Sequence, residues 1–382
     1  MNIRKQKSVS ILLVFLLVGI LLIGCSSQAN NDSQPNTVAN SKYEIQQSVI
    51  DKIKCQVEIY NTAPKYPEGD FRNYPSGNRT PGVETFVFDC WEYEITKEDS
   101  IRIINYWNHS ETDVQIPDEI DSRSVRVLGS GSLSHHIKLE NVYLPSTLTH
   151  IESHAFYRCY SLQSIYIPNN VLYIGDHAFF RCVSLTSINV ENTNACYSDH
   201  EGVLYDKWQS ELLIYPEGKT SKRYALPCTV QVIGQSVPGY SIFGYTNYSL
   251  EEIYIPSSVK KIDGYPFFRC NSLKTITVNP TSEYFSDIDG VLFNYEQTEL
   301  ITYPLAKEQT SYTVPKTIQC IDDYAFGFNI NHLNELVVYS TVTEFPDHDI
   351  FDFALVMIVD QNSMAEQYAI KYRINYKYIK EE

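Results

Sequence analysis

The sequence lacks the short motifs that carry common enzyme chemistries. It contains no Gly-x-Ser-x-Gly, no His-Glu-x-x-His, no Walker loop and no dinucleotide-binding fingerprint. The adjacent His135 and His136 are a poor start for a metal site, because neighbouring residues of a strand point to opposite faces. The segment Asp347-His348-Asp349 is expected to be a solvated turn. We therefore predict no catalytic residue, no metal site and no cofactor.

Positive charge is also scarce. The chain has 30 Lys and Arg against 46 Asp and Glu, which gives a formal net charge of −16 at pH 7. Nucleic-acid binding depends on clusters of Lys and Arg that neutralise phosphates. An acidic chain of this kind is a poor candidate for that role, so we expect no nucleic acid among its partners.

Long hydrophobic runs are missing as well. The longest, Val9–Ile23, has about 15 residues, fewer than the roughly 20 that a helix needs to cross a bilayer. Three basic residues precede it, and the sequence Leu22-Ile23-Gly24-Cys25 that ends it resembles the lipobox of bacterial lipoproteins. The resemblance implies that residues 1–24 are a signal peptide and that Cys25 carries a diacylglyceryl anchor. The alternative is a transmembrane anchor with an incidental cysteine.

The segment after the predicted signal peptide is expected to link the membrane anchor to the folded repeats. Residues 25–42 are rich in Ser, Asn, Gln and Asp, a composition typical of a disordered tether. Residues 43–90 form a poorly defined N-terminal region. The predicted location is extracytoplasmic, with the chain held on the cell membrane by its lipid.

A unit of 23 residues repeats along the rest of the chain. Leu139, Leu162 and Leu185 are 23 apart, and so are Leu250 and Leu273. Between them the apolar residues, a Pro, an Ala-Phe pair and a Cys recur at fixed offsets. A period of 20 to 29 residues is typical of a solenoid, in which each coil buries its apolar face against the next.

The positions within one unit have a physical reading. Ile165 and Ile167 are two apart, so on a strand they share the inner face and Tyr166 takes the outer one. Val171 and Ile174 are three apart, which favours a short helical or 3₁₀ turn. Further along the unit, the small Ala of the Ala-Phe pair lets neighbouring backbones come close together. The Phe ring fills the centre of the coil.

The pattern L-x-x-I-x-I-P-x-x-V-x-x-I-G-x-x-A-F-x-x-C resembles the BspA-like (treponemal-type) leucine-rich repeats of bacterial surface proteins. The resemblance covers roughly residues 91–382. It implies a β-rich right-handed superhelix of short stacked strands joined by 3₁₀ or short helical turns. It also implies a secreted or anchored protein with a role in binding or adhesion.

A second period of 88 residues overlies the first. At this spacing, Leu250 is the equivalent of Leu162, and the segment Gly290-Val291-Leu292-Phe293 is the equivalent of Gly202-Val203-Leu204-Tyr205. Each compound block is therefore one 23-residue coil followed by a unit of about 65 residues. We predict one hairpin in each longer unit, formed by the segments 203–205 with 212–215 and 291–293 with 300–303. The start of a calcium loop at Asp287-x-Asp289-Gly290 lacks its remaining ligands.

Both ends of the array are expected to be capped. An N-terminal cap with a degenerate first coil should cover residues 91–138, with Trp91–Ile95 and Ile101–Tyr106 as a strand pair. The repeat array then runs over 139–352. The C-terminal cap should cover 353–382, with a strand at Ala354–Val359, a helix from Ser363 to Tyr372 and a last strand.

The cysteines other than Cys25 allow several roles. Cys159, Cys182 and Cys270 recur at one coil position and are read as small buried apolar residues. In an oxidising compartment, Cys55 and Cys90 could form a disulfide, and so could Cys196 and Cys228. The connectivity does not follow from the sequence.

The outward positions of the repeat strands form the candidate binding face. Tyr, Ser, Thr and Asn dominate it, a composition suited to recognition. Its predicted residues are Tyr143, Tyr166, Asn189, Tyr254 and Thr277 in one column and Asn141, Ser164, Ser187, Glu252 and Thr275 in a second. A plainer explanation is that Tyr is a good strand residue that stabilises its neighbours.

These features lead to three hypotheses. The first is a monomeric surface lipoprotein that binds a macromolecule, an extracellular protein, in adhesion. The second is a glycan-binding protein for uptake or envelope attachment, in which sugars stack on Tyr143, Tyr166 and Tyr254. The third is a structural envelope protein without a soluble ligand. We place an enzyme behind all three.

Overall fold

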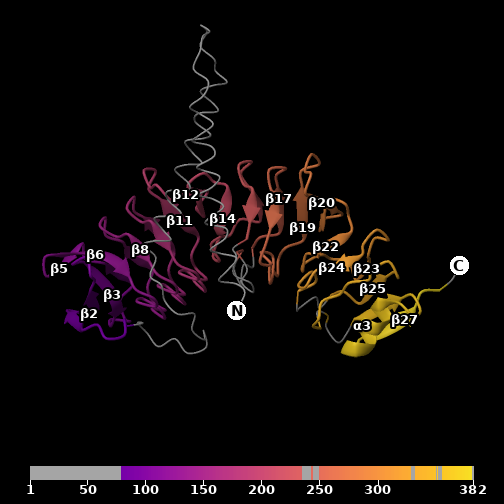
Figure 1. The fold of residues 1–382 in the computed structure, drawn as a ribbon, viewed down its shortest axis with the longest axis horizontal. Helices are drawn as coiled ribbons and strands as arrows, with labels where there is room; N and C mark the ends of the chain where they lie inside the picture. Colours follow the sequence, from indigo (N-terminus) through magenta and orange to yellow (C-terminus); the bar gives the residue numbers. More distant parts are fainter. Residues whose placement is uncertain are drawn as a thin grey trace, which may run out of the picture. The chain divides into compact units, whose positions relative to one another are not determined.

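The computed structural model describes residues 79–234, 242–243, 249–327, 332–349, 351 and 355–380. The predicted signal peptide, tether and most of the N-terminal region lie outside these residues. The described chain is a β-solenoid of about 11 turns, whose regular elements are nearly all strands, and its strands follow one another in sequence order (Figure 1). The solenoid predicted from the 23-residue period is therefore confirmed.

One ladder of parallel strands carries the L-x-x-I-x-I segments. It is divided into three sheets, each internally in register. The first holds β4 (Asp113–Gln115), β7 (Asn141–Tyr143), β9 (Ser164–Ile167) and β11 (Ser187–Val190); the second holds β15 (Arg223–Ala225), β17 (Glu252–Ile255) and β19 (Thr275–Val278); the third holds β23 (Ser311–Thr313), β25 (Glu335–Val338), β26 (Val356–Val359) and β27 (Asn375–Tyr378). We call this the first ladder.

A second parallel ladder is built from shorter strands later in each coil. Its members are β3 (Ile101–Tyr106), β6 (Arg123–Leu128), β8 (His150–Ile151) and β10 (Tyr173–Ile174), then β14 (Glu211–Ile214), β16 (Val232–Ile233) and β18 (Lys261–Ile262), then β22 (Glu299–Thr302) and β24 (Cys320–Ile321). Ile174 lies in β10, not in a helical turn as the spacing suggested, because its strand pairs with β8. The tight turn is formed before it, by the hydrogen bond from Val171 N to Pro168 O.

The core lies between the two ladders. Ile165 and Ile167 are buried, whereas Tyr166 between them is 53% exposed, as the strand period predicts. The Phe rings stack from coil to coil, with centroids of Phe156 and Phe179 5.5 Å apart. The Ala-Phe segments are hydrogen-bonded turns rather than 3₁₀ helices. Each fully buried Ile or Phe contributes about 1.5–3 kcal/mol.

Each longer unit of the compound block inserts antiparallel strands. In the first, β12 (Tyr197–His200) pairs with β13 (Val203–Asp206), and β13 pairs with β14. In the second, β20 (Phe285–Ile288), β21 (Val291–Asn294) and β22 repeat this order. The predicted pairings β13–β14 and β21–β22 are confirmed. The strands β12 and β20 were not predicted, since the sequence only marked the turns that follow them.

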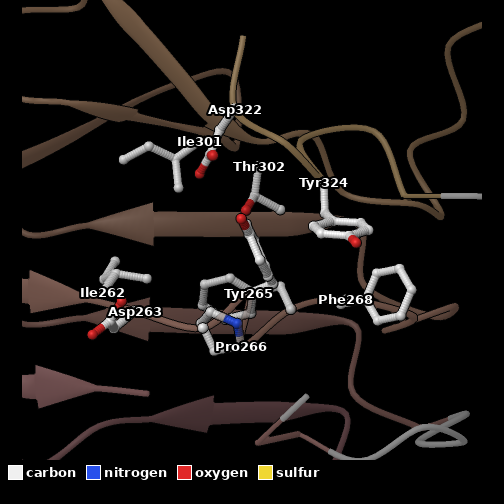
Figure 2. Close-up of a pocket in the computed structure, with 11 residues that line it drawn as sticks. Ile262, Asp263, Tyr265, Pro266, Phe268, Ile301, Thr302, Asp322 and Tyr324 are labelled. Atoms are coloured by element: carbon white, nitrogen blue, oxygen red, sulfur yellow. The ribbon is translucent and has the colours of Figure 1, made fainter. Parts of the chain in front are cut away.

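The second ladder is interrupted between β18 and β22, which belong to different sheets. A cavity of about 230 Å³ opens at this point. It is lined by residues from both sides of the interruption, as Figure 2 shows.

The N-terminal cap is an antiparallel sheet joined to the second ladder. β1 (Thr85–Phe88) pairs with β2 (Trp91–Ile95), which pairs with β3, and β5 (Glu119–Ile120) pairs with β6. The predicted β2–β3 pair is confirmed. β1 was not predicted, because it lies just before the region that resembles the repeats.

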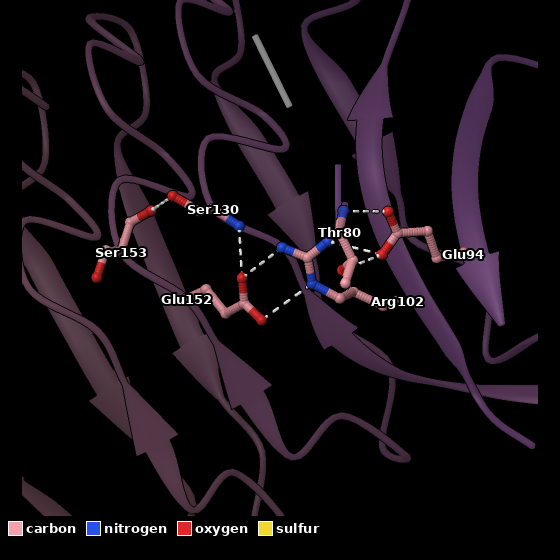
Figure 3. A network of polar contacts seen from close by, with 6 residues as sticks. All are labelled: Thr80, Glu94, Arg102, Ser130, Glu152 and Ser153. Carbon is pink, nitrogen blue, oxygen red and sulfur yellow. Dashed lines mark hydrogen bonds and ion pairs between the residues drawn. The ribbon is translucent and has the colours of Figure 1, made fainter. Parts of the chain in front are cut away.

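A buried ionic network joins this cap to the first coils. Arg102 bonds Glu152 through Nε (3.0 Å) and Nη2 (2.7 Å), and its Nη1 reaches Glu94 at 3.2 Å. Thr80 donates to Glu94, and Ser130 N donates to Glu152 at 2.8 Å. Figure 3 shows Arg102 between the two carboxylates. Breaking such a buried network costs about 3–5 kcal/mol, because it leaves a charge uncompensated.

The C-terminal cap contains β26, the helix α3 (Met364–Tyr372) and β27. Ser363 Oγ accepts from Glu366 N at 3.1 Å, so Ser363 is the N-cap residue that the sequence predicts. β26 and β27 continue the first ladder in parallel register, and α3 connects them.

Candidate binding face

The outward residues of the first ladder are in register, as predicted. Tyr166 is opposite Asn189, and Ser164 is opposite both Ser187 and Asn141. In the second sheet, Tyr254 is opposite Thr277 and Glu252 is opposite Thr275. All ten predicted face residues are therefore placed on strands of this ladder, in the two columns that the sequence indicates.

The two columns are interrupted, however, where the sequence predicts one continuous face. The tip of the β12–β13 hairpin lies beside β11: Gly202 O accepts from Ile188 N at 2.8 Å. The tip at Gly290 does the same beside β19, where Ile276 N donates to it at 3.0 Å. One sheet thus holds Tyr143, Tyr166 and Asn189. The next sheet holds Tyr254 and Thr277, the other two residues of this column.

The first sheet exposes two tyrosines of the predicted face. Tyr143 is 55% exposed and Tyr166 is 53% exposed, whereas Tyr254, on the second sheet, is less exposed and partly buried. Asn189 is also exposed. Within the described residues, the hydroxyls of Tyr143 and Tyr166 make no hydrogen bond, so both are available to a ligand. We call Tyr143, Tyr166 and Asn189 the tyrosine face.

The second column is more occupied by contacts within the protein. Asn141 Nδ2 donates to Asp113 Oδ1 at 2.8 Å, and Arg223 forms an ion pair with Glu252 at 2.9 Å. Hydrogen bonds from Thr112 and Asn141 lower the pKa of Asp113. Asp113 lies on β4 at the end of this column and was missed, since β4 belongs to the degenerate first coil.

Residues weighed for metal binding have structural roles instead. Both ring nitrogens of His136 lie within hydrogen-bond distance of backbone carbonyl oxygens, of Leu133 at 2.9 Å and of Tyr106 at 3.0 Å, and the neutral ring donates to one of the two. Burial lowers the pKa of His136. Asp287 Oδ1 accepts from Val278 N at 2.7 Å. In the described ranges, no group of three or more His, Cys, Asp or Glu is arranged to hold a metal ion.

The cysteines divide into buried and peripheral thiols. Cys159, Cys182 and Cys270 are free and buried, as predicted. Cys159 Sγ donates to Leu133 O at 3.1 Å, and Cys182 Sγ donates to Phe156 O at 3.1 Å. Burial raises the pKa of Cys159 to about 12, which leaves almost no reactive thiolate at neutral pH.

The suggested pairing of Cys196 with Cys228 is wrong. Cys228 is a free, exposed thiol after β15, whereas Cys196 is buried beside β12. Cys90 forms no disulfide with any described residue, and its suggested partner Cys55 lies outside them, so that disulfide stays a prediction. Cys25 also lies outside them. No helix in the described part of the chain is long and apolar enough to span a bilayer.

Comparison with protein families identifies the repeats. The model of the family described as "BspA type Leucine rich repeat region" matches residues 90–200 and 239–308 in six copies. Residues 90–200 and 239–308 of this β-solenoid thus carry BspA-type leucine-rich repeats, as the sequence pattern indicates.

Three solved structures of bacterial proteins match parts of the chain. A leucine-rich repeat protein from Eubacterium ventriosum is 19% identical over 73% of this chain and 73% of its own, with a TM-score of 0.44. A leucine-rich cell surface protein from Faecalibacterium prausnitzii is 18% identical over 75% and 97%, with a TM-score of 0.41. The pneumococcal vaccine antigen PcpA is 18% identical over 72% and 66%, with a TM-score of 0.38. No curated protein matches significantly.

Proposed function

We propose that this protein is a lipid-anchored surface protein that binds another protein through the tyrosine face. The carrying observation is that Tyr143 and Tyr166, on neighbouring strands, are both more than half exposed, and that no other described residue bonds either hydroxyl. Two rigid aromatic side chains side by side offer contact area at low entropic cost. BspA-type repeat proteins are typically surface proteins in protein–protein interactions, which supports the same role.

Anchoring through Cys25 is the second part of the proposal. It rests on the basic residues, the short apolar run and the sequence Leu22-Ile23-Gly24-Cys25. Two or three acyl chains hold a protein stably on a membrane. Metabolic labelling with an alkyne fatty acid should label the native chain and not Cys25→Ser. Equal labelling of both chains would contradict lipid attachment at this residue.

The partner can be located by site-specific photo-crosslinking. A photoreactive phenylalanine at Tyr166 should give a crosslinked protein adduct on intact cells. The same residue at Tyr295 is the matched control, because Tyr295 is also 53% exposed but lies in the loop between β21 and β22. Equal adducts from both positions, or none from Tyr166, would contradict binding at the tyrosine face.

A further inference from the structure

The cavity between β18 and β22 combines aromatic rings with a carboxylate. One side is formed by residues 262–268, and the other by Ile301, Thr302, Asp322 and Tyr324. In Figure 2, the ring of Tyr265 stands between the two coils with its hydroxyl end toward Thr302. The cavity lies on the second ladder, outside the tyrosine face, so an inference about it is independent of the proposed function.

The aromatic side chains of the cavity are fixed by one another. The rings of Tyr265 and Tyr324 meet edge to face with centroids 4.4 Å apart, and Phe268 meets Tyr324 at 5.1 Å. Tyr265 Oη donates to Asp323 Oδ2 at 3.1 Å. Aromatic rings held in place attract a cation, because the ring face is electrostatically negative.

The carboxylates of the cavity differ in their partners. Asp263 forms an ion pair with Lys261. Asp322 accepts a hydrogen bond from Asp323 N at 2.7 Å, but in the described part of the chain it has no basic partner. Burial and the neighbouring Asp323 raise the pKa of Asp322. A half-buried carboxylate beside a second acid is stabilised by an incoming cation.

The volume of the cavity limits the occupant. About 230 Å³ is less than the roughly 300–1,000 Å³ typical of pockets that enclose a small-molecule ligand. It suits a single side chain of a partner. Among cationic side chains, a guanidinium is planar, stacks on aromatic rings and can bond a carboxylate through two parallel N–H groups. Arg269, which follows the cavity residue Phe268 in the sequence, shows this stacking, with its Cζ 5.4 Å from the centroid of the Phe268 ring.

We propose that the cavity between β18 and β22 is a binding site for an arginine side chain of a partner polypeptide. Asp322 bonds the guanidinium, and the rings of Tyr265 and Tyr324 pack against it. The equivalent positions of the first compound block carry Gly234, His177 and Ile214 in place of Asp322, Tyr265 and Thr302. The site is therefore specific to the second block.

The test is a ligand-observed NMR titration of the full chain with acetyl-Gly-Arg-Gly-amide. The matched probe is the same peptide with citrulline, which keeps the shape of the side chain but has no charge. We expect the arginine peptide to bind about tenfold tighter or more, as hydrogen bonds to charged groups imply. Equal binding of the two peptides would overturn the proposal.

Variants identify the residue responsible. Asp322→Asn should remove the preference for arginine, while Glu283→Gln, an exposed carboxylate outside the cavity, should retain it. Thr302→Ile introduces the first-block residue and should weaken both peptides by narrowing the cavity, which provides a second test if Asp322→Asn folds poorly. An unchanged preference in Asp322→Asn would refute the site. Loss of Tyr143 and Tyr166 should leave peptide binding unaffected, which separates this site from the tyrosine face.

Discussion

In their described residues, the two compound blocks, 162–249 and 250–337, have the same order of strands with different side chains. Their polar contacts to the backbone agree closely. Asp199 Oδ1 accepts from Val190 N at 2.8 Å, and Asp287 Oδ1 accepts from Val278 N at 2.7 Å. Asp206 and Asn294 each accept two backbone N–H groups in the turn before the next strand. The carboxylate of Asp206 and the amide oxygen of Asn294 thus make equivalent hydrogen bonds to the backbone.

The blocks differ in a buried hydroxyl pair. In the first, Tyr205 and Tyr224 share a hydrogen bond of 2.6 Å between their hydroxyls. In the second, Phe293 stands in the place of Tyr205, and the buried Tyr312 Oη has no hydrogen-bond partner among the described residues. The fold therefore requires the backbone contacts and the ring volumes, whereas this hydroxyl pair is an addition in one copy. The predictions below test that distinction.

The stacked Phe residues should be equally important in both blocks. Phe179 stacks on Phe156 at 5.5 Å, and Phe267 stacks on Phe243 at 5.2 Å, all four buried. Phe179→Ala and Phe267→Ala should each lower the free energy of unfolding by about 3–5 kcal/mol. Urea denaturation of the full chain measures both. A loss in one block only would show that the blocks are not equivalent in packing.

The hairpin tips should respond unequally to an added methyl group. Gly202 and Gly290 both have φ of +76°, but a Cβ would be 2.6 Å from Ser187 Cβ at the first and 3.0 Å from Thr275 Cγ2 at the second. The conformation alone costs about 1–2 kcal/mol for an L-residue. Gly202→Ala should therefore destabilise by about 2–3 kcal/mol and Gly290→Ala by less. Calorimetric Tm values rank the two, and the reverse ranking would contradict the difference in contact.

The hydroxyl pair can be removed from one block and added to the other. Tyr205→Phe should destabilise by about 1–2 kcal/mol, because it removes the 2.6 Å bond between the hydroxyls and leaves buried Tyr224 only its longer bond to His200 O, at 3.4 Å. Phe293→Tyr should stabilise by about 0.5–1.5 kcal/mol by bonding Tyr312. Paired denaturation curves measure both changes. Destabilisation by Phe293→Tyr would mean that the second block has no room for the hydroxyl.

The smallest expected effect concerns pH and Asp322. Its pKa is raised above the ordinary value of 3.8, so between the two values the folded chain holds a proton that the unfolded chain has released. This contribution makes stability fall as pH rises through that window. Asp322→Asn should therefore be slightly more stable than the native chain at pH 7, and the gain should vanish well below pH 3.8. A gain that is the same at both pH values would contradict this origin.

The sequence predicts what depends on the 23-residue period. That period identifies the inward residues such as Ile165, the outward residues such as Tyr166, and the register that brings the columns together. The 88-residue period predicts the paired hairpins. Ser363 marks the helix of the C-terminal cap, because an N-cap side chain acts within one turn of chain.

The sequence does not predict what depends on how the longer units pack. The position of Gly202 beside β11, which divides the binding face, is set by the packing of a 65-residue unit without the short period. The cavity at Asp322 and Tyr265 arises between coils that are separated along the chain. The buried position of Cys196 and the exposed position of Cys228 are likewise tertiary outcomes.

The most direct measurement compares binding by the native chain, the double variant Tyr143→Ser/Tyr166→Ser and the control Tyr295→Ser on arrays of extracellular proteins and glycans. Circular dichroism confirms that all three are folded. We expect the native chain and the control to bind the same protein ligand and the double variant to lose it. A ligand retained by the double variant would contradict the tyrosine face as the binding site, and a ligand found only among the glycans would replace protein binding with sugar recognition.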